Sequence, residues 1–302
     1  MATHPVTTTK MSATNPIHIL SLGAGVQSST MALMAASGLI NPMPDCAIFA
    51  DTGAEPKHVY EQLEYLRNAL PFPIHVVSGG NLYEDLMSGS KRASWGRPPF
   101  FVVNDNQKAG QLNRQCTGDY KLDPIRRKVR EIVGLTRKKS PAYPVVVQWI
   151  GISLDEVARA KQSSEPWQTN RFPLLDMGMT RDLCVAWLKT NGHPIPKKSA
   201  CFFCSYRDDE GWQDMKVNDP VSFAKGCEVD KKIRHDMPGV SKSETFVHRS
   251  LTPLVQIDFP KRIAEAKERS EERATKKEKN AWRDNGGQIN LFLNECAGIC
   301  GV

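Results

Sequence analysis

An apolar stretch that breaks into glycines and hydroxyl side chains constrains the fold of this chain more than any other segment. It reads Ile-Leu-Ser-Leu-Gly-Ala-Gly-Val-Gln-Ser-Ser-Thr over residues 19–30. We interpret it as a strand, a phosphate-binding loop and a helix, because glycines let a backbone approach an anion and a helix N-terminus carries positive partial charge. The residues expected to bind the ligand here are Ser21, Gly23, Ala24, Gly25, Gln27, Ser28 and Ser29.

Two further apolar runs end in polar or glycine-containing turns. The predicted strand 47–51 runs into Asp51-Thr52-Gly53, and the run 144–150 ends at Gly151-Ile152. Ligands bind at the carboxyl ends of the strands in open α/β sheets. We therefore expect both turns to join the first loop in one site.

The order of apolar segments predicts the fold class. Strands are predicted at 17–22, 47–51, 74–78 and 144–150, and helices at 29–37, 56–70, 124–133 and 180–190. This alternation is typical of an α/β protein with a doubly wound parallel sheet. The Gly-, Ser-, Lys- and Arg-rich stretch 88–99 is predicted to be a mobile loop.

Composition divides the chain into four parts. We expect a flexible arm at 1–15, a nucleotide-binding α/β domain at 16–170, a helical cysteine-containing part at 171–260, and a charged helix with a cysteine-containing tail at 261–302. No apolar run approaches the roughly 20 residues that cross a bilayer. The first fifteen residues are polar and lack the apolar core of a secretory signal. We therefore expect a cytoplasmic protein with no membrane partner.

Several motifs carry a family resemblance. Gly23-Ala-Gly-Val-Gln-Ser28 resembles the PP-loop of the adenine-nucleotide α-hydrolase superfamily, usually Ser-Gly-Gly-x-Asp-Ser, with Gln27 in place of the Asp. Asp51-Thr52-Gly53 resembles the Asp-Thr-Gly segment of phosphoadenosine phosphosulfate (PAPS) reductases and their relatives. Gly151-Ile152 with Glu156 and Arg159 is similar to that family's Gly-Ile-Arg-x-x-Glu-Ser-x-Arg region. The segment with Cys116, Lys121 and Pro124 belongs to the same resemblance.

The resemblance implies a HUP/PP-loop type fold and an enzyme that binds ATP or PAPS, with Mg²⁺ as a further candidate cofactor. It implies chemistry at the phosphate or sulfate end of the nucleotide, in sulfur transfer or reduction, with Asp51, Arg159 and Cys296 as catalytic candidates. One alternative is an ATP-dependent adenylating enzyme that modifies DNA or tRNA and forms AMP and pyrophosphate. Another is a non-catalytic nucleotide- or nucleic-acid-binding module. The sequence does not indicate the oligomeric state.

Cysteines are the second source of chemistry. Cys201-Phe-Phe-Cys204 places two thiols in one loop, which suits a metal centre. PAPS-reductase relatives place cluster cysteines near the position of Cys116, and Cys184 is the candidate fourth ligand. Four thiolates would suit a [4Fe-4S] cluster or zinc. The alternative is a pair of thiols packed as small apolar groups beside Phe202 and Phe203.

The C-terminal tail contains Cys296 and Cys300. It resembles the Glu-Cys-Gly-x-His tail of PAPS reductases, whose cysteine attacks the sulfonyl sulfur, and a thiol reductant protein would then be a partner. The pair could equally be redox-active, complete a metal site, or be inert.

The net charge of +7 favours acidic partners. The mixed charges of 261–283 predict a solvated helix held by i,i+4 pairs. A second basic cluster has two interpretations: it holds substrate phosphates, or it covers the outside of a helix. It contains Lys121, Arg126, Arg127, Lys128 and Arg130.

Overall fold

A five-stranded sheet forms the body of the computed structural model, which describes residues 16–92, 96–104, 106, 108–136, 140–237, 240 and 243–284. The strands are β1 (Ile17–Leu22), β2 (Cys46–Asp51), β3 (Ile74–Ser78), β6 (Val146–Ile150) and β7 (Gln168–Arg171), in the order β3-β2-β1-β6-β7. All neighbours run parallel, and Ile19 of β1 pairs with Cys46 on one side and Gln148 on the other. The chain winds outward from β1 to β3 and then resumes beside β1 with β6. The predicted doubly wound parallel sheet is confirmed.

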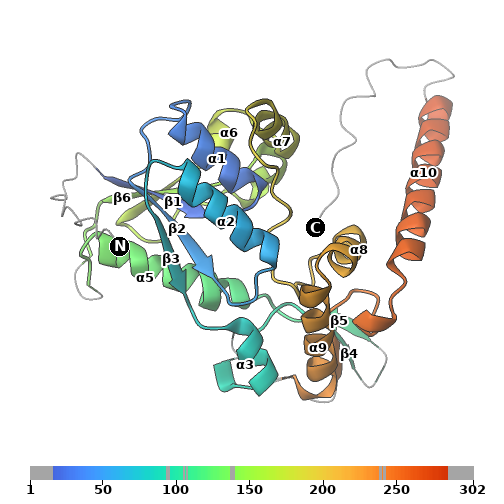
Figure 1. Cartoon of the computed structure of the whole chain (residues 1–302). Coiled ribbons are helices and arrows are strands. Elements are labelled where there is room, and N and C mark those ends of the chain that lie inside the picture. The colour runs from blue at the N-terminus through green and yellow to red at the C-terminus, as the bar shows by residue number, and fades with distance from the viewer. Residues whose placement is uncertain are drawn as a thin grey trace.

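Helices cover both faces of this sheet (Figure 1). One face carries α1 (Val26–Ala36), α2 (Lys57–Ala69), α6 (Pro173–Asp176) and α7 (Arg181–Thr190), and the other carries α5 (Asp123–Ile132). Met31, Leu63 and Leu188 belong to one apolar core, whereas Val129 and Trp167 belong to another. Because both faces are buried, the strands are almost continuously apolar.

Packing does not follow the domain boundary predicted at residue 170. Leu174 of α6 and Cys184 and Leu188 of α7 lie in the same core as α1. Residues 171–190 are therefore part of the α/β body rather than of a separate helical part. The helix predicted at 29–37 also begins earlier, at Val26, directly after its N-cap Gly25.

A second sheet was not predicted. It contains β4 (Phe101–Asn104), β5 (Ala109–Gln111) and β8 (Ser243–Phe246), antiparallel and in the order β5-β4-β8. Phe101 pairs with Phe246, so segments far apart in the sequence meet here. Strands of three or four residues are too short to show an alternating pattern in a sequence.

The stretch predicted as a mobile loop divides into two parts in the structure: residues 88, 89, 91 and 92 are exposed, whereas 96–99 are largely buried. After α3 (Leu82–Ser88), Gly96 donates a backbone hydrogen bond to Arg92 and lies against Tyr120. Phe100, which follows this stretch, is fully buried. Gly96 is therefore anchored to η1 (Gly118–Leu122), a π-helical turn that contains Tyr120.

Beyond these elements the chain is mainly helical. α8 (Asp209–Asn218) and α9 (Pro220–Asp236) pack together. The short helix η3 (Leu254–Gln256) contacts α9, and η2 (Leu154–Arg159) contacts α6. α10 (Phe259–Asp284) packs by its start on α8 and then projects from the body (Figure 1). Its described side chains from 266 to 276 are exposed, which confirms the predicted solvated helix. No helix within the described ranges is both long and apolar enough to span a membrane.

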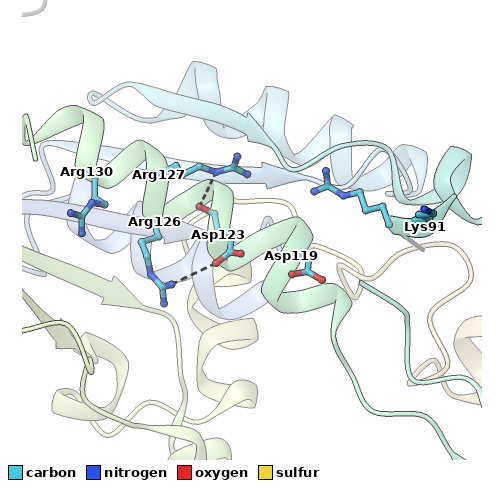
Figure 2. A pocket seen from close by; sticks show the side chains of 7 residues that line it. Lys91, Asp119, Asp123, Arg126, Arg127 and Arg130 are labelled. Atoms are coloured by element: carbon cyan, nitrogen blue, oxygen red, sulfur yellow. Dashed lines mark hydrogen bonds and ion pairs between the residues drawn. The ribbon is translucent and has the colours of Figure 1, made fainter. Parts of the chain in front are cut away.

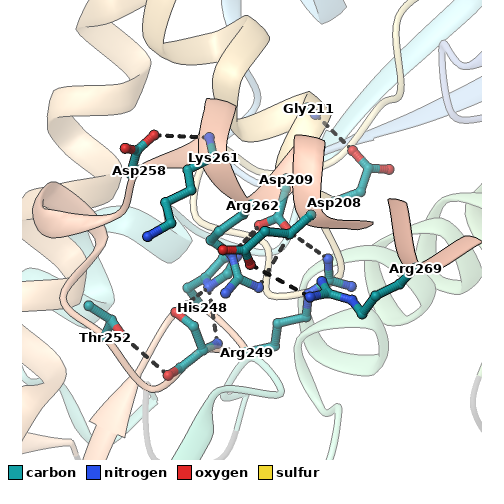
Figure 3. A network of polar contacts seen from close by, with 12 residues as sticks. Asp208, Asp209, Gly211, His248, Arg249, Thr252, Asp258, Lys261, Arg262 and Arg269 are labelled. Carbon is teal, nitrogen blue, oxygen red and sulfur yellow. Dashed lines mark hydrogen bonds and ion pairs between the residues drawn. The ribbon is translucent and has the colours of Figure 1, made fainter. Parts of the chain in front are cut away.

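A buried carboxylate fastens the start of α10 (Figure 3). Asp209 accepts hydrogen bonds from His248 Nε2 at 2.8 Å, Arg249 Nη2 at 2.7 Å and Arg262 Nε at 3.2 Å. His248 Nδ1 accepts from the Ser250 N–H, so Nε2 carries the proton that Asp209 receives. Burial opposes ionisation of Asp209, but its hydrogen bonds to Arg249, Arg262 and His248 hold its pKa below the ordinary value.

Candidate functional site

The loop after β1 lies where the winding of the sheet reverses, between β1 and β6. Ala24 adopts a left-handed backbone with φ of 52°, and α1 starts at Val26 with Gly25 as N-cap. The Gly23 N–H donates to Ser28 Oγ at 3.1 Å, which closes the loop. Gly25 has no side chain to cap α1, so the first amides of the helix are available to an anion. Open α/β sheets bind ligands at such a point of reversal.

Two glycines at this loop lie at close approaches of neighbouring segments. A Cβ on Gly151 would lie 3.0 Å from the Ser28 backbone nitrogen, so the end of β6 touches the first turn of α1. A Cβ on Gly25 would lie 3.0 Å from Ser199 Oγ. Ser199, two residues before Cys201, therefore lies against the loop.

Gln27 recruits a cation to the loop. Its Oε1 accepts from Arg181 Nη1 at 3.3 Å, and its Nε2 donates to Ser153 Oγ at 3.4 Å. Arg159, the cation expected from the sequence, instead pairs with Glu156, and its side chain is 63% exposed. Arg181 was missed because it lies at the start of α7, far from every motif in the sequence.

Asp51 organises the turn that follows β2. Its Oδ1 accepts from the Gly53 N–H at 2.8 Å and from Tyr60 Oη at 2.9 Å. Gly53 has a φ of 68°, and a Cβ there would lie 2.6 Å from Asn81 Cγ, so only glycine fits. Burial and the Asp51 hydrogen bond raise the pKa of Tyr60. In this structure Asp51 holds the turn that presents Thr52.

A buried ion pair follows this turn. The Glu55 side chain is 1% exposed, and its Oε1 accepts from Lys121 Nζ at 2.9 Å and from Thr52 Oγ1 at 3.1 Å. Cys201 Sγ lies 3.4 Å from Thr52 Oγ1 and 4.0 Å from Glu55 Oε1. Glu55 Oε2 is buried without a hydrogen-bond partner. Burial opposes the charge on Lys121, but the Glu55 carboxylate raises its pKa above the ordinary value.

Three of the predicted metal ligands share one cavity beside this ion pair. The cavity, which we call the thiol pocket, has a volume of about 90 Å³ and contains Cys116, Cys201 and Cys204 in its lining. Arg114, Thr117, Lys121 and Ser199 line it as well. Burial, and then the Glu55 carboxylate, raise the pKa of Cys201, and burial raises that of Cys116. Both thiols therefore hold their protons near neutral pH in this arrangement.

Cys184, the fourth predicted ligand, lies elsewhere. It is fully buried on α7 in the core shared with α1, and its carbonyl oxygen accepts from Thr30 Oγ1 at 3.5 Å. Burial raises the pKa of its thiol to about 11, so it packs as a neutral group. The expectation of a four-cysteine set is corrected here: a small apolar side chain facing α1 was mistaken for a ligand.

The described side chains do not form a metal site as they are arranged. No group of three or more His, Cys, Asp or Glu residues is placed to hold a metal ion within the part of the chain that the structure describes. The three cysteines of the pocket do not by themselves supply the four thiolates expected of a [4Fe-4S] or zinc site. Cys296 and Cys300 lie outside the described residues.

Comparison with known proteins gives limited similarity. No protein-family model and no curated protein matches the sequence. Among solved structures, the chain is similar to a phosphoadenylyl-sulfate (PAPS) reductase from Candida auris in its phosphate complex. The identity is 14% and the TM-score 0.42, over 62% of this chain and 82% of that chain. Similarity of this extent is too low to transfer an activity, so function has to be inferred from the residues of the site.

Proposed function

We propose that this protein is a PP-loop type enzyme that binds an adenine nucleotide at residues 23–29 and performs sulfur chemistry at its phosphate or sulfate end. One observation supports this most strongly: Ser199 touches the Gly25 loop and also lines the thiol pocket. An anion held by the loop would therefore have the pocket beside it. The motif resemblance to PAPS reductases supports the same proposal.

The loop supplies the nucleotide-binding part of the proposal. The open first turn of α1 provides backbone N–H groups, and Arg181 provides a cation that Gln27 holds in place. Such a pair of features binds phosphate groups in many α/β proteins. Gln27 lacks the carboxylate that would attract Mg²⁺, so Arg181 is the group we expect to offset phosphate charge.

The thiol pocket supplies the sulfur step. With PAPS as substrate, the Glu55 carboxylate accepts the proton of Cys201, and the thiolate attacks the sulfonyl sulfur. The bond from sulfur to its bridging oxygen breaks, and adenosine bisphosphate leaves with the electron pair. The Cys204 thiol then attacks Cys201 Sγ, its proton passes to the departing sulfite, which leaves as hydrogen sulfite, and a Cys201–Cys204 disulfide remains. A thiol reductant protein would return the disulfide to two thiols. Cys296 is the alternative nucleophile.

With ATP as substrate, the same site supports a second function. An acceptor oxygen would attack the α-phosphorus and release pyrophosphate, and sulfur would then displace AMP from the adenylated acceptor. A wide basic surface close to the thiol pocket, described below, favours a nucleic-acid acceptor for this version. The two versions differ in their products: sulfite and adenosine bisphosphate in one, AMP and pyrophosphate in the other.

Nucleotide binding is tested by calorimetric titration of ATP and PAPS into wild type and Gly25→Ala. The added methyl group would meet Ser199 Oγ and narrow the loop, so we expect affinity to fall about tenfold, or about 1.4 kcal/mol. The matched control is Gly110→Ala in β5, where a Cβ meets only Val102 at 3.5 Å. If neither nucleotide binds wild type, or if both variants weaken binding equally, the proposal is wrong.

The metal part of the proposal is tested separately. Iron, sulfide and zinc are measured in protein purified without oxygen, beside a Cys201→Ser/Cys204→Ser variant and a Cys227→Ser control. Iron and sulfide lost only in the double variant would show a cluster that takes ligands from outside the described residues. Zinc lost in the same way would show a structural metal. If the protein contains neither iron nor zinc, both thiols are available for the attack proposed with PAPS.

A further inference from the structure

A second and larger hollow adjoins the element that borders the thiol pocket. It has a volume of about 730 Å³, and we call it the arginine groove. η1 contributes to both hollows, with Lys121 in the thiol pocket and Asp119 in the groove. The lining residues of the groove are Lys91, Arg92, Asp119, Asp123, Arg126, Arg127 and Arg130. Cations outnumber carboxylates in this lining, so the groove favours an anionic partner.

One wall of the groove is α5. Arg126, Arg127 and Arg130 follow one another along this helix, as Figure 2 shows. With a rise of about 1.5 Å per residue, the first and last of them are about 6 Å apart along the helix axis. Arg130 is held in place over the Trp167 ring, 5.3 Å from its centroid. The wall therefore presents a row of guanidinium groups rather than a single charge.

The opposite wall holds Arg92. Its guanidinium lies 4.8 Å from the centroid of the Tyr120 ring. A Cβ on Gly80 would lie 3.4 Å from Arg92 Cζ, so the absence of a side chain on this glycine leaves room for the arginine. Gly80 lies two residues after β3, which places Arg92 near the carboxyl edge of the main sheet. An anion bound there would lie at the edge that carries the candidate site.

The ion pairs inside the groove are weak enough to be exchanged. Arg126 lies 3.6 Å from Asp123 and 3.6 Å from Glu165, and its side chain is 49% exposed. Arg92 lies 3.9 Å from Asp85 and is 44% exposed. Pairs this long and this exposed contribute little to stability. A phosphate oxygen pair offers guanidinium a bidentate partner and would replace them readily.

We propose that the arginine groove binds the phosphodiester backbone of a nucleic acid, and that this nucleic acid is the acceptor in the ATP version of the proposed function. A row of guanidinium groups matches a row of phosphates better than it matches a single nucleotide. Among the described residues that line the groove there is no aromatic side chain on which a base could stack. Binding through the backbone is independent of base sequence. Only the role of the strand as acceptor rests on the proposed function.

The test is a fluorescence-anisotropy titration of the full chain at several salt concentrations. The probes are labelled single-stranded DNA, single-stranded RNA and duplex DNA of about 20 nucleotides, long enough to exceed one binding site. For Arg126→Gln/Arg127→Gln we expect at least a tenfold loss of affinity. The slope of the logarithm of affinity against the logarithm of salt concentration should become shallower by about 1.4 for a single strand. Each lost phosphate contact removes about 0.7 from this slope.

The matched control removes two charges elsewhere. Lys267→Gln/Lys276→Gln acts on exposed positions of α10 and should bind the probes as wild type does. Arg92→Gln, on the opposite wall, provides a second groove variant should the first unfold. Equal losses in the groove and α10 variants would overturn the proposal. If polyglutamate competes as well as an unlabelled oligonucleotide of equal charge, the assignment to nucleic acid is wrong.

Titration of the same proteins with ATP and PAPS separates the two proposals. Adenine nucleotide binding without oligonucleotide binding would overturn the groove and leave the proposed function standing. Oligonucleotide binding without adenine nucleotide binding would do the opposite. We expect the groove variants to retain adenine nucleotide affinity, because their side chains lie outside the Gly25 loop and the thiol pocket.

Discussion

The Glu55 carboxylate carries its charge inside the protein, where isolated charges are costly. It is tolerated because Lys121 Nζ and Thr52 Oγ1 both donate to one of its oxygens. The other oxygen, Oε2, is buried without a partner, and Cys201 Sγ lies 4.0 Å from the paired oxygen, Oε1. The ion pair with Lys121 therefore neutralises the buried Glu55 carboxylate and leaves this carboxylate able to accept a proton.

This arrangement predicts strong coupling between the two residues. Lys121→Met should lower the free energy of unfolding by about 1–3 kcal/mol, because a buried carboxylate is left with one hydrogen bond fewer and no cation. Adding Glu55→Gln to that variant should restore most of the loss. Urea denaturation of the two single variants and the double variant measures the coupling. Additive losses would show that the pair is not coupled.

The junction of β6 with α1 positions the loop at residues 23–28 at the level of whole elements. Gly151 ends β6 at a point where the chain touches Ser28 in the first turn of α1. These two elements are brought together by strand pairing between β1 and β6, in which Ser21 aligns with Ile150. The loop is thus shaped by a strand that lies more than a hundred residues away in the sequence.

Gly151→Ala should disturb that junction. The added methyl group would meet the Ser28 backbone at 3.0 Å, and backbone has to shift to relieve it. We expect a loss of about 1–3 kcal/mol in the free energy of unfolding and weaker nucleotide binding. Gly118→Ala is the control, since nothing lies within 4 Å of a Cβ there. Unfolding curves that coincide for the two variants would contradict the close approach.

The pH dependence of stability belongs to the whole molecule. His18, His58, His75 and His248 lie in different parts of the structure, and burial lowers the pKa of each below the ordinary 6.5. At His248 the nearby Asp209 opposes this, but two arginines already neutralise that carboxylate. In the unfolded chain all four histidines take up protons at their ordinary pKa.

Stability should therefore fall as the pH drops. Between each lowered pKa and 6.5 the unfolded state binds more protons, so the free energy of unfolding rises with pH through that window and levels off above it. Asp209, whose pKa is lowered, adds a further loss below about 4. Thermal unfolding at closely spaced pH values, with His248→Gln as the comparison, measures both parts. An unfolding temperature that stays constant from neutral pH down to pH of about 5 would contradict it.

The sequence by itself predicted most strands and helices of the main sheet and its layers. Residues 19–30 contain local signals of a loop and a helix start, namely glycines and hydroxyl side chains. These signals can be read from the sequence because backbone freedom and helix capping depend on neighbouring residues. The strand predicted at 74–78 matches β3, and alternating strands and helices predicted the parallel sheet correctly. The association of Cys116 with Cys201 and Cys204 in one pocket also agrees with the sequence prediction.

Only the tertiary structure decided which distant residues meet. Cys184 and the pocket cysteines look alike in sequence, yet α7 packs against α1 and buries Cys184 in the core. Arg181 replaces Arg159 at the loop because the start of α7 lies beside Gln27. The antiparallel sheet joins Phe101 to Phe246 by a pairing that leaves no local pattern. Such contacts depend on packing between elements, which periodicity and spacing along a single chain do not encode.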